Sequence, residues 1–415
     1  MKTKGKVVAG IDIGSSKIAT IIAQVSLEEQ RVNVIGASSI PSLGVRKGQI
    51  VNIEEASSAV INSVEAAERM AGYSLERVVV GVGGGHISSQ NSHGVVAVAE
   101  PEGEIVPEDV RRVIEAAKAI SLPSSREILH VIPRTYTVDS QEGVADPVGM
   151  SGVRLEVETH IISGSTTSIK NLVKCVSEVG VDIDALVFTG VAAAEAILNE
   201  TEKELGVVLV DIGGGTTSLI IFQEGSPAYT AVLPIGAKNI TNDLAIGLRL
   251  SLESAEKLKL ALKEENGQDE IDLEKIGIVE AKSVSRKTVI EGIIKPRLNE
   301  IFNLVGAEIQ KSGFAGLTPS GIVICGGGAM TVGAADVCKK VLALPVRIGY
   351  PTKISGLVDD ITTPAFASSV GLILYADKQN YPAKFSFPKM GKIIEKIPVK
   401  SGFSKAIQLI KSFLP

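Results

Sequence analysis

The sequence of 415 residues contains no tryptophan, three cysteines and four histidines, and these scarcities exclude several classes of protein. Cys175, Cys325 and Cys338 are scattered without a CxxC spacing, so they predict free thiols in a reducing compartment rather than a disulfide framework. The histidines form no metal-binding array, and buried or strand positions are expected for them. They are His86, His93, His130 and His160.

Long apolar runs are also missing. No run reaches the ~18–20 residues that a membrane-spanning helix needs, and the N-terminal MKTKGKVVAG enters a predicted strand without the apolar core of a signal peptide. The chain is nevertheless 45% hydrophobic and 21% charged, which leaves enough apolar material for large cores. We expect a cytosolic protein of two core domains with insertions.

Charge is unevenly distributed along the chain. The formal net charge is −5, but residues 378–415 hold eight lysines against one acid, Glu395, so this segment carries +7 and the rest −12. A basic tail on an acidic body predicts an anionic partner for the tail. No nucleic-acid partner is expected.

The stretch LVDIGGGTTSLIIF, residues 209–222, places an aspartate and three glycines between two apolar runs. Residues 207–210 and 219–222 predict two short buried strands, joined by a tight hairpin. Successive N–H groups at such a turn form a cradle for an anion. Asp211 would repel a bare phosphate, so it predicts a metal ion held through water, as Mg²⁺ prefers. An ordinary glycine-rich hairpin is the alternative.

The pattern occurs a second time, in VAGIDIGSSKIATIIAQ at residues 8–24. Asp12 aligns with Asp211 at a separation of 199 residues, which is too long for a solenoid and predicts two similar domains that each place one hairpin in a shared cleft. A third glycine cluster, GIVICGGGAM at 321–330, predicts a strand that leads into a turn and a helix. Close approach of that backbone to a base or ribose would explain its glycines.

Two such hairpins followed by a triple-glycine turn resemble the actin-like ATPase superfamily. The resemblance implies an α/β fold of two ribonuclease-H-like halves around a nucleotide cleft that holds ATP, with Mg²⁺ bound through water by Asp12 and Asp211. The implied phosphate-binding residues are Gly14, Ser15, Ser16, Lys17, Gly213, Gly214, Gly215, Thr216 and Thr217. The implied adenosine-binding residues are Glu256, Lys259, Gly326, Gly327 and Gly328.

Two of these assignments have simpler alternatives. Glu256 and Lys259 lie three residues apart in SAEKLKLA, on one face of a predicted helix. Superfamily members have an acidic and a basic residue there that meet the ribose and base, but an exposed ion-pair face is the alternative. Lys17 follows the first hairpin and could either reach a phosphate or be solvated.

Rapid hydrolysis is not expected. Superfamily members that hydrolyse ATP place a glutamine or glutamate just before the second hairpin to orient the attacking water, and the matching residue here is Thr189. A threonine is shorter and orients water poorly. Glu195, on a predicted helix six residues later, would need an unusual geometry to replace it. No catalytic residue is therefore assigned.

Further stretches narrow the family. GGHISSQNSHG, REILHVIP, DPVGMSGVRLEVETHI, PVRIGYP and TPAFASSVGLILYA closely resemble the bacterial cell-division family FtsA, and the resemblance covers essentially the whole chain. The family implies a protein that polymerises, binds ATP and anchors FtsZ filaments of the Z ring to the cytoplasmic membrane face at the division site. It also implies recruitment of later division proteins.

The family pattern gives the expected boundaries. The first core subdomain is expected to span residues 1–81 and 163–198. Between these two segments, an inserted α+β subdomain, residues 82–162, replaces the usual small subdomain of the first half. The second core subdomain is expected to span residues 199–236 and 321–376, and its small subdomain residues 237–320. Helices are expected around 54–71, after Asn52, and from Pro107.

In FtsA the second small subdomain receives the FtsZ tail, and Arg297 matches an arginine of that surface. A solvent-facing arginine is the alternative.

The C-terminal SGFSKAIQLIKSFLP, residues 401–415, predicts an amphipathic helix whose apolar side spans an arc of about 160°. The preceding residues 377–400 contain three prolines and spaced lysines and predict a mobile linker. A helix of this kind is typical of a reversible anchor to anionic membrane lipid, and a helix docked on protein is the alternative. The expected membrane-facing residues are Phe403, Ile407, Leu409, Ile410, Phe413 and Leu414.

Three other functions fit parts of the pattern. A sugar kinase would need a carboxylate base beside the γ-phosphate, which no motif supplies. An Hsp70-type chaperone would need a long C-terminal peptide-binding domain, yet about 40 residues follow the actin-like core. A PilM-like pilus scaffold shares the FtsA-type insertion but would lack the terminal amphipathic helix.

Overall fold

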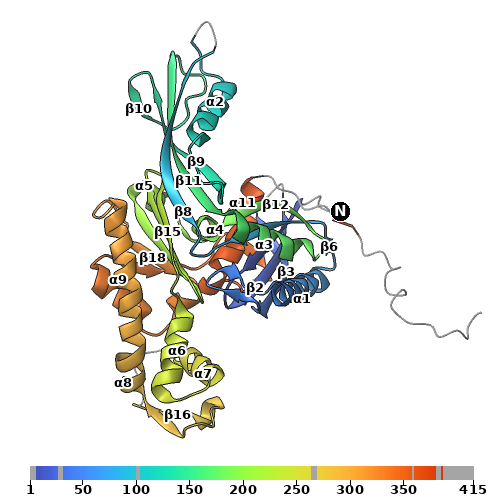
Figure 1. Ribbon diagram of the computed structural model, residues 1–415, viewed down its shortest axis with the longest axis vertical. Helices are drawn as coiled ribbons and strands as arrows, with labels where there is room; N and C mark the ends of the chain where they lie inside the picture. The colour runs from blue at the N-terminus through green and yellow to red at the C-terminus, as the bar shows by residue number, and fades with distance from the viewer. Residues whose placement is uncertain are drawn as a thin grey trace, which may run out of the picture.

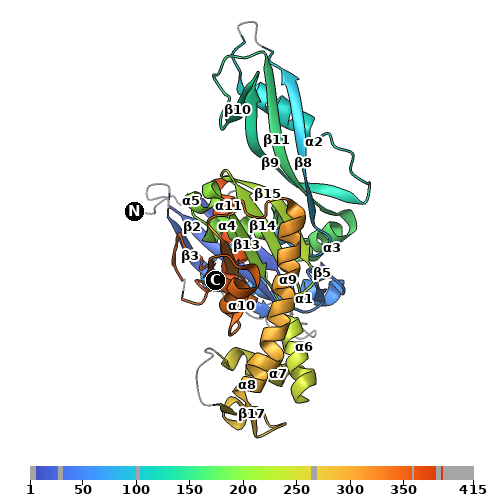
Figure 2. The same ribbon diagram turned by 90° about the vertical axis from the view of Figure 1, so that its left-hand side faces the viewer.

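The computed structural model describes residues 6–26, 31–99, 103–262, 269–357 and 359–379, and the backbone of 385–386. Two halves lie side by side in the middle of an elongated molecule (Figure 1). A subdomain of strands and one helix extends from one end of the long axis, and a mainly helical subdomain forms the other end (Figures 1 and 2). The amphipathic helix predicted at 401–415 and most of the predicted linker lie outside the described residues.

The first half is built on a six-stranded sheet with the order β12-β7-β1-β2-β3-β20. Two helices, α1 (Ile53–Ala71) and α3 (Thr166–Ser177), pack together beside it. α1 confirms the helix predicted after Asn52, whose side chain accepts a hydrogen bond from the N–H of Glu55. The strands are β1 (Lys6–Ile13), β2 (Lys17–Val25), β3 (Val32–Pro41), β7 (Arg77–Val82), β12 (Asp182–Phe188) and β20 (Ile354–Gly356).

The second half has a five-stranded sheet with the order β15-β14-β13-β18-β19. The predicted strands on either side of the three glycines are confirmed as β13 and β14, which pair antiparallel. α10 (Ala334–Leu342) follows the third glycine cluster. The strands are β13 (Val207–Ile212), β14 (Thr217–Gln223), β15 (Ser226–Leu233), β18 (Ile322–Cys325) and β19 (Val346–Ile348).

Two helices join the halves. α4 (Thr189–Ile197) and α11 (Ala367–Lys378) pack on each other and share one core with strands of both sheets. Their approach is close, because a Cβ added to Gly371 would lie 1.8 Å from the carbonyl oxygen of Ala192. No other residue type fits at this position of α11 without separating the two helices.

The prediction that residues 321–376 belong to the second core is wrong in its C-terminal part. β20 pairs in parallel with β3 of the first sheet, and α11 packs on β1, β2 and β7 of the same sheet. Apolar content identifies a buried helix but not the sheet that covers it. α11 also continues two residues into the predicted linker, and β21 (Phe385–Ser386) pairs with β6 (Ser74–Leu75).

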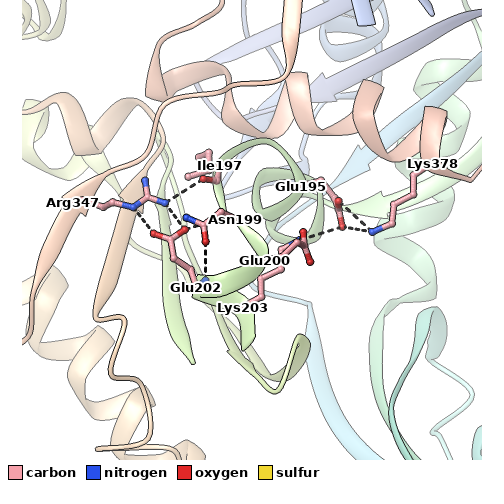
Figure 3. Close-up of polar contacts among 8 residues, drawn as sticks. All are labelled: Glu195, Ile197, Asn199, Glu200, Glu202, Lys203, Arg347 and Lys378. Carbon is pink, nitrogen blue, oxygen red and sulfur yellow. Dashed lines mark hydrogen bonds and ion pairs between the residues drawn. The ribbon is translucent and has the colours of Figure 1, made fainter. Parts of the chain in front are cut away.

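Polar contacts fix the junction where the chain passes into the second half (Figure 3). Arg347 on β19 donates two hydrogen bonds, of 2.6 and 2.7 Å, to the carboxylate of Glu202 on α5 (Glu200–Leu205). Beside them, Glu195 accepts hydrogen bonds of 3.2 and 3.4 Å from Lys378 at the end of α11. The predicted helical position of Glu195 is confirmed, and its carboxylate faces this lysine.

The inserted subdomain has a four-stranded antiparallel sheet in the order β10-β9-β11-β8, with its own small core and one covering helix. The helix confirms the one predicted from Pro107. No helix in the described ranges, here or elsewhere, is long and apolar enough to cross a membrane. The elements are β8 (Ser88–Ala97), α2 (Pro107–Lys118), β9 (Arg126–Val138), β10 (Gln141–Val144) and β11 (Arg154–Ser165).

Both ends of the inserted subdomain join the first half, but its sheet is hydrogen-bonded to β15 of the second half. Ser89 Oγ donates to the carbonyl oxygen of Thr230 at 2.9 Å, and Asn91 Nδ2 donates to that of Ala228 at 3.3 Å. His160 is fully buried here. Its Nδ1 donates to Asn91 Oδ1 at 2.7 Å, and its Nε2 accepts from the Thr230 hydroxyl at 2.9 Å. Both nitrogens of the neutral imidazole ring therefore form a hydrogen bond.

The opposite end of the molecule is mainly helical and shares the core of the second half. α8, the π-helical segment η2 and α9 follow one another without a break. The π-helical turn lies just before Pro296, which has no N–H to donate. The elements are α6 (Ala237–Leu248), α7 (Leu252–Ala261), β16 (Glu270–Asp272), β17 (Ser283–Ser285), α8 (Arg286–Val289), η2 (Ile290–Ile294) and α9 (Lys295–Ser312).

The buried His160 predicts a loss of stability in acid. Burial lowers its pKa to about 3, against about 6.5 in the unfolded chain. The neutral ring therefore makes its full contribution to the free energy of unfolding above pH ~6.5. This contribution is lost as the pH falls toward ~3, at up to about 1.4 kcal/mol per pH unit. In His160→Gln, the free energy of unfolding from urea titrations should fall less steeply between about pH 6 and 4. Equal slopes in both proteins would contradict a neutral His160.

Candidate functional site

A cavity of about 630 Å³ lies between the two halves, at the carboxyl ends of β1, β7, β13 and β18. Both predicted hairpins, the 326–328 turn and the facing sides of α6 and α7 line it. A volume of this size is typical of a site for a small-molecule ligand.

The two hairpins have the same geometry. The Gly14 N–H donates to the carbonyl oxygen of Lys17 at 3.0 Å, and the Gly213 N–H donates to that of Thr216 at 2.8 Å. The hairpins also touch, because a Cβ on Gly214 would lie 2.9 Å from the Cβ of Ser16. The prediction of two similar hairpins in one cleft is confirmed, and the glycine at 214 is required by close approach.

Each half contributes one partly buried carboxylate to the cavity. Asp12 accepts a hydrogen bond of 2.9 Å from Ser369, and Asp211 accepts one of 3.0 Å from Ser368, so consecutive residues of α11 hold both aspartates. Burial raises the pKa of both carboxyls, that of Asp211 to about 6, where the neighbouring Asp12 adds to the rise. Lys17 completes the cluster.

The Lys17 ammonium group interacts with an aromatic ring and with both aspartates. Its Nζ lies 2.9 Å from the centroid of the Phe366 ring. Burial lowers its pKa to about 8, while the charges of Asp12 and Asp211 act in the opposite direction. Lys17 lines the cavity and is largely enclosed, so the solvated alternative does not describe it.

The carboxylate pair fits a hydrated divalent cation. Asp12 and Asp211 are hard oxygen donors, and the single charge of Lys17 offsets only part of the charge of the two carboxylates in this enclosed place. Across the described ranges, no group of three or more histidine, cysteine or acidic side chains is arranged to hold a metal ion. An ion at this pair would therefore take its other ligands from water or from a bound anion.

The far side of the cavity is formed by α7. Lys259 Nζ donates to Glu256 Oε2 at 2.7 Å and to Thr241 Oγ1 on α6 at 2.9 Å. Lys259 is buried, so the exposed ion-pair alternative does not apply to it. Leu252 and Leu260 on the same helix are exposed and line the cavity, which gives this side the apolar surface that a flat base would cover.

The third glycine cluster lies against the second aspartate. Gly326 has a φ of +80°, and a Cβ there would lie 2.2 Å from Asp211 Oδ1, so glycine is required on both counts. Gly326, Gly327 and Gly328 all line the cavity.

Two predicted phosphate-binding residues do not line the cavity. Thr217 is buried, and its hydroxyl donates to the carbonyl oxygen of Ile235 at 2.9 Å. Successive side chains of β14 point to opposite faces, so Ser218 lines the cavity instead and the role predicted for the Thr217 side chain is corrected. Gly215 packs on Ser15, whose Oγ would lie 2.8 Å from an added Cβ.

Of the three remaining residues singled out in the sequence, Thr189, Glu195 and Arg297, only Thr189 lines the cavity. Thr189 lines the cavity at the start of α4, whereas Glu195 does not. Arg297 lies on α9, where its guanidinium donates to both carboxylate oxygens of Asp243, at 2.5 and 2.8 Å, and pairs with Glu300. Arg297 is thus largely neutralised rather than simply solvent-facing.

Sequence reasoning missed three residues of the site: Ser368, Ser369 and Lys238. The serines lie 157 and 357 residues from the aspartates that they contact, and no local pattern connects them. Lys238 lines the cavity from the second residue of α6. No motif in the sequence marked it, because its hydrogen-bond acceptor, Ser15, lies 223 residues away.

Two family models match the chain. One is described as the SHS2 domain inserted in FTSA and matches residues 84–163, and the other as cell division protein FtsA and matches residues 208–371. The cell division protein FtsA of Borreliella burgdorferi is 39% identical over 407 residues, which cover 97% of this chain and 97% of that protein. That of Bacillus subtilis is 38% identical over 398 residues, covering 94% and 88%. The chain belongs to the FtsA family.

Solved structures agree with the fold expected for FtsA. The PilM-PilN type IV pilus biogenesis complex is similar with a TM-score of 0.63 at 17% identity, over 89% of this chain and 98% of that one. MreB5 of Spiroplasma citri bound to ADP has a TM-score of 0.52 at 12% identity, over 90% and 97%. At such identities the likeness shows the fold alone. The predicted actin-like α/β fold with an inserted subdomain is confirmed.

Proposed function

We propose that this FtsA protein binds ATP with Mg²⁺ between its halves, polymerises, and anchors FtsZ filaments to the cytoplasmic membrane face at the division site. The main support is a cavity between two equivalent hairpins, into which each half places one partly buried carboxylate, in a chain of a cell-division family. Other division proteins would join the assembly through the same chain.

The residues that line the cavity favour one orientation of a bound nucleotide. The two hairpins offer backbone N–H groups and serine hydroxyls to phosphates, while α7 and the 326–328 turn frame the nucleoside. Asp12 and Asp211 would hold Mg²⁺ through water, and the ion would offset phosphate charge. MreB5, which shares the fold, was solved with ADP.

The cleft is proposed to act mainly as a nucleotide-dependent hinge with slow or no hydrolysis. Thr189, the residue at the position expected to orient water, has only a short hydroxyl beside Gly83. Glu195 is held by Lys378 outside the cavity and offers no replacement. Steady-state turnover should therefore stay below roughly 1 per second, the lower end of typical enzyme turnover.

Nucleotide binding should depend on the carboxylate pair and on Mg²⁺. Asp12→Asn and Asp211→Asn keep the shape and the serine hydrogen bond but remove the charge that holds the ion, so each should weaken MgATP about tenfold or more. Calorimetry with and without EDTA measures the effect, and chelation should weaken the wild type more than either variant. The exposed Asp336→Asn is the matched control. Unchanged MgATP affinity in both cavity variants would remove the pair from the site.

The small subdomain of the second half is proposed to receive the FtsZ tail at Arg297. FtsZ tails of this family are short and mix acidic with apolar residues, so a guanidinium could bind a tail carboxylate in place of Asp243 or Glu300. The Arg297 side chain is 25% exposed, which leaves part of the group accessible.

This proposal predicts opposite effects for the two partners of the ion pair. Arg297→Met should weaken binding of an FtsZ-tail peptide about tenfold, because a charge-assisted hydrogen bond is lost. Asp243→Asn should leave peptide affinity unchanged or stronger, because it removes a competitor for the guanidinium. Fluorescence anisotropy measures both, with MgATP affinity as the folding control. Equal weakening by the two substitutions would instead assign the pair a structural role.

The C-terminal segment is proposed to be a reversible membrane anchor. It lies outside the described residues, and its support is the apolar arc and the lysines of the sequence. Each inserted apolar side chain contributes at most ~1.5–3 kcal/mol and each lysine near anionic lipid about 1 kcal/mol, so one helix binds weakly. Polymerisation would combine many such anchors into stable attachment.

Co-sedimentation with liposomes tests the anchor. Deleting residues 401–415 should abolish pelleting with anionic vesicles while the far-ultraviolet circular dichroism of the body is retained. Ile407→Glu places a carboxylate among acyl chains and should act nearly as strongly, whereas Gln408→Glu, with the same charge change on the polar side, should retain most binding. Raised salt should weaken binding only partly. Undiminished pelleting of the truncated chain would favour the docked-helix alternative.

A further inference from the structure

The start of α6 is fixed to the second phosphate hairpin. The Ala237 N–H donates to the carbonyl oxygen of Gly213 at 2.9 Å, and the Lys238 N–H donates to that of Gly214 at 2.8 Å. A Cβ on Gly236 would lie only 2.5 Å from the Gly213 oxygen, so the chain is tightly packed here. The backbone position of Lys238 therefore follows the second hairpin.

The side chain of Lys238 crosses to the other half. Its Nζ donates a hydrogen bond of 2.7 Å to the carbonyl oxygen of Ser15, in the first hairpin. Ser15 is buried, and its hydroxyl accepts from the Gly48 N–H at 2.8 Å, so the acceptor is held in place. Lys238 is thus a direct side-chain contact from the second half to the first hairpin, and both residues line the cavity.

Lys238 differs from the other two lysines of the cavity in its partners. Lys259 forms an ion pair with Glu256, and Lys17 lies over an aromatic ring and beside two aspartates. Within the described part of the chain, Lys238 forms no ion pair with a carboxylate, and its Nζ has one neutral acceptor. An ammonium group has three N–H donors, so two remain for an anion in the cavity.

The geometry points to Lys238 as a phosphate-binding residue that reaches a bound nucleotide across the cleft from the second half. This inference rests on the proposed nucleotide function. Because the lysine also binds the first hairpin, its contact with the phosphates is complete only when the two hairpins are close together. Phosphate binding and approach of the two halves are thereby coupled through one side chain.

Competition against a fluorescent ATP analogue tests this role. Lys238→Met should raise the dissociation constant of MgATP about tenfold or more, the effect expected for one charge-assisted hydrogen bond. Lys238→Arg, which keeps the charge, should stay within about threefold of the wild type. Lys275→Met is the matched control, because Lys275 lies in the same subdomain, is 81% exposed and is absent from the cavity lining.

A second measurement separates a phosphate contact from a purely structural one. If Lys238 binds phosphate, MgATP affinity of the wild type should fall more steeply with salt concentration than that of Lys238→Met. Equal salt slopes, or an unchanged dissociation constant in Lys238→Met, would overturn the inference while leaving nucleotide binding intact. Failure of the wild type to bind MgATP would overturn the proposed function itself. Thermal unfolding without nucleotide confirms that each variant is folded.

Discussion

The close contact between α4 and α11 is the constraint on which the rest of this FtsA structure depends. An added Cβ on Gly371 would lie 1.8 Å from the Ala192 carbonyl oxygen, so the two helices are in backbone contact. On the other side of α11, an added Cβ on Gly10 of β1 would lie 2.9 Å from the Cβ of Leu372. Small residues thus set the thickness of the layer between the two sheets. That thickness in turn sets how far apart the two hairpins lie.

The same helix connects this packing to the chemistry of the cavity. Ser368 and Ser369, in the first turn of α11, contact Asp211 and Asp12, which come from different halves. Moving α11 by a small amount would disturb both carboxylates together, because adjacent residues of one rigid helix hold them. The positions of both carboxylates are therefore determined by a helix that contributes no charge of its own to the pair.

Local sequence patterns predicted the parts of the site that repeat and missed those that depend on tertiary packing. The Asp-Ile-Gly hairpins were recognisable because the glycines and the flanking strands are adjacent in the chain. The return of α11 to the first half was not, since periodicity does not choose between two sheets. Thr217 was misassigned because strand alternation turns neighbouring side chains to opposite faces, a distinction that composition does not make. Lys238 was missed because its acceptor is 223 residues away.

The hydrogen bonds between the inserted sheet and β15 have a mechanical consequence. The subdomain is covalently continuous with the first half, yet Ser89, Asn91 and His160 bind the second. Its strands extend far from this attachment along the long axis (Figure 2). A rotation of one half against the other must either break these bonds or tilt the whole subdomain. In the second case it behaves as a lever arm, with its fulcrum at His160 and its largest displacement at the distal tip.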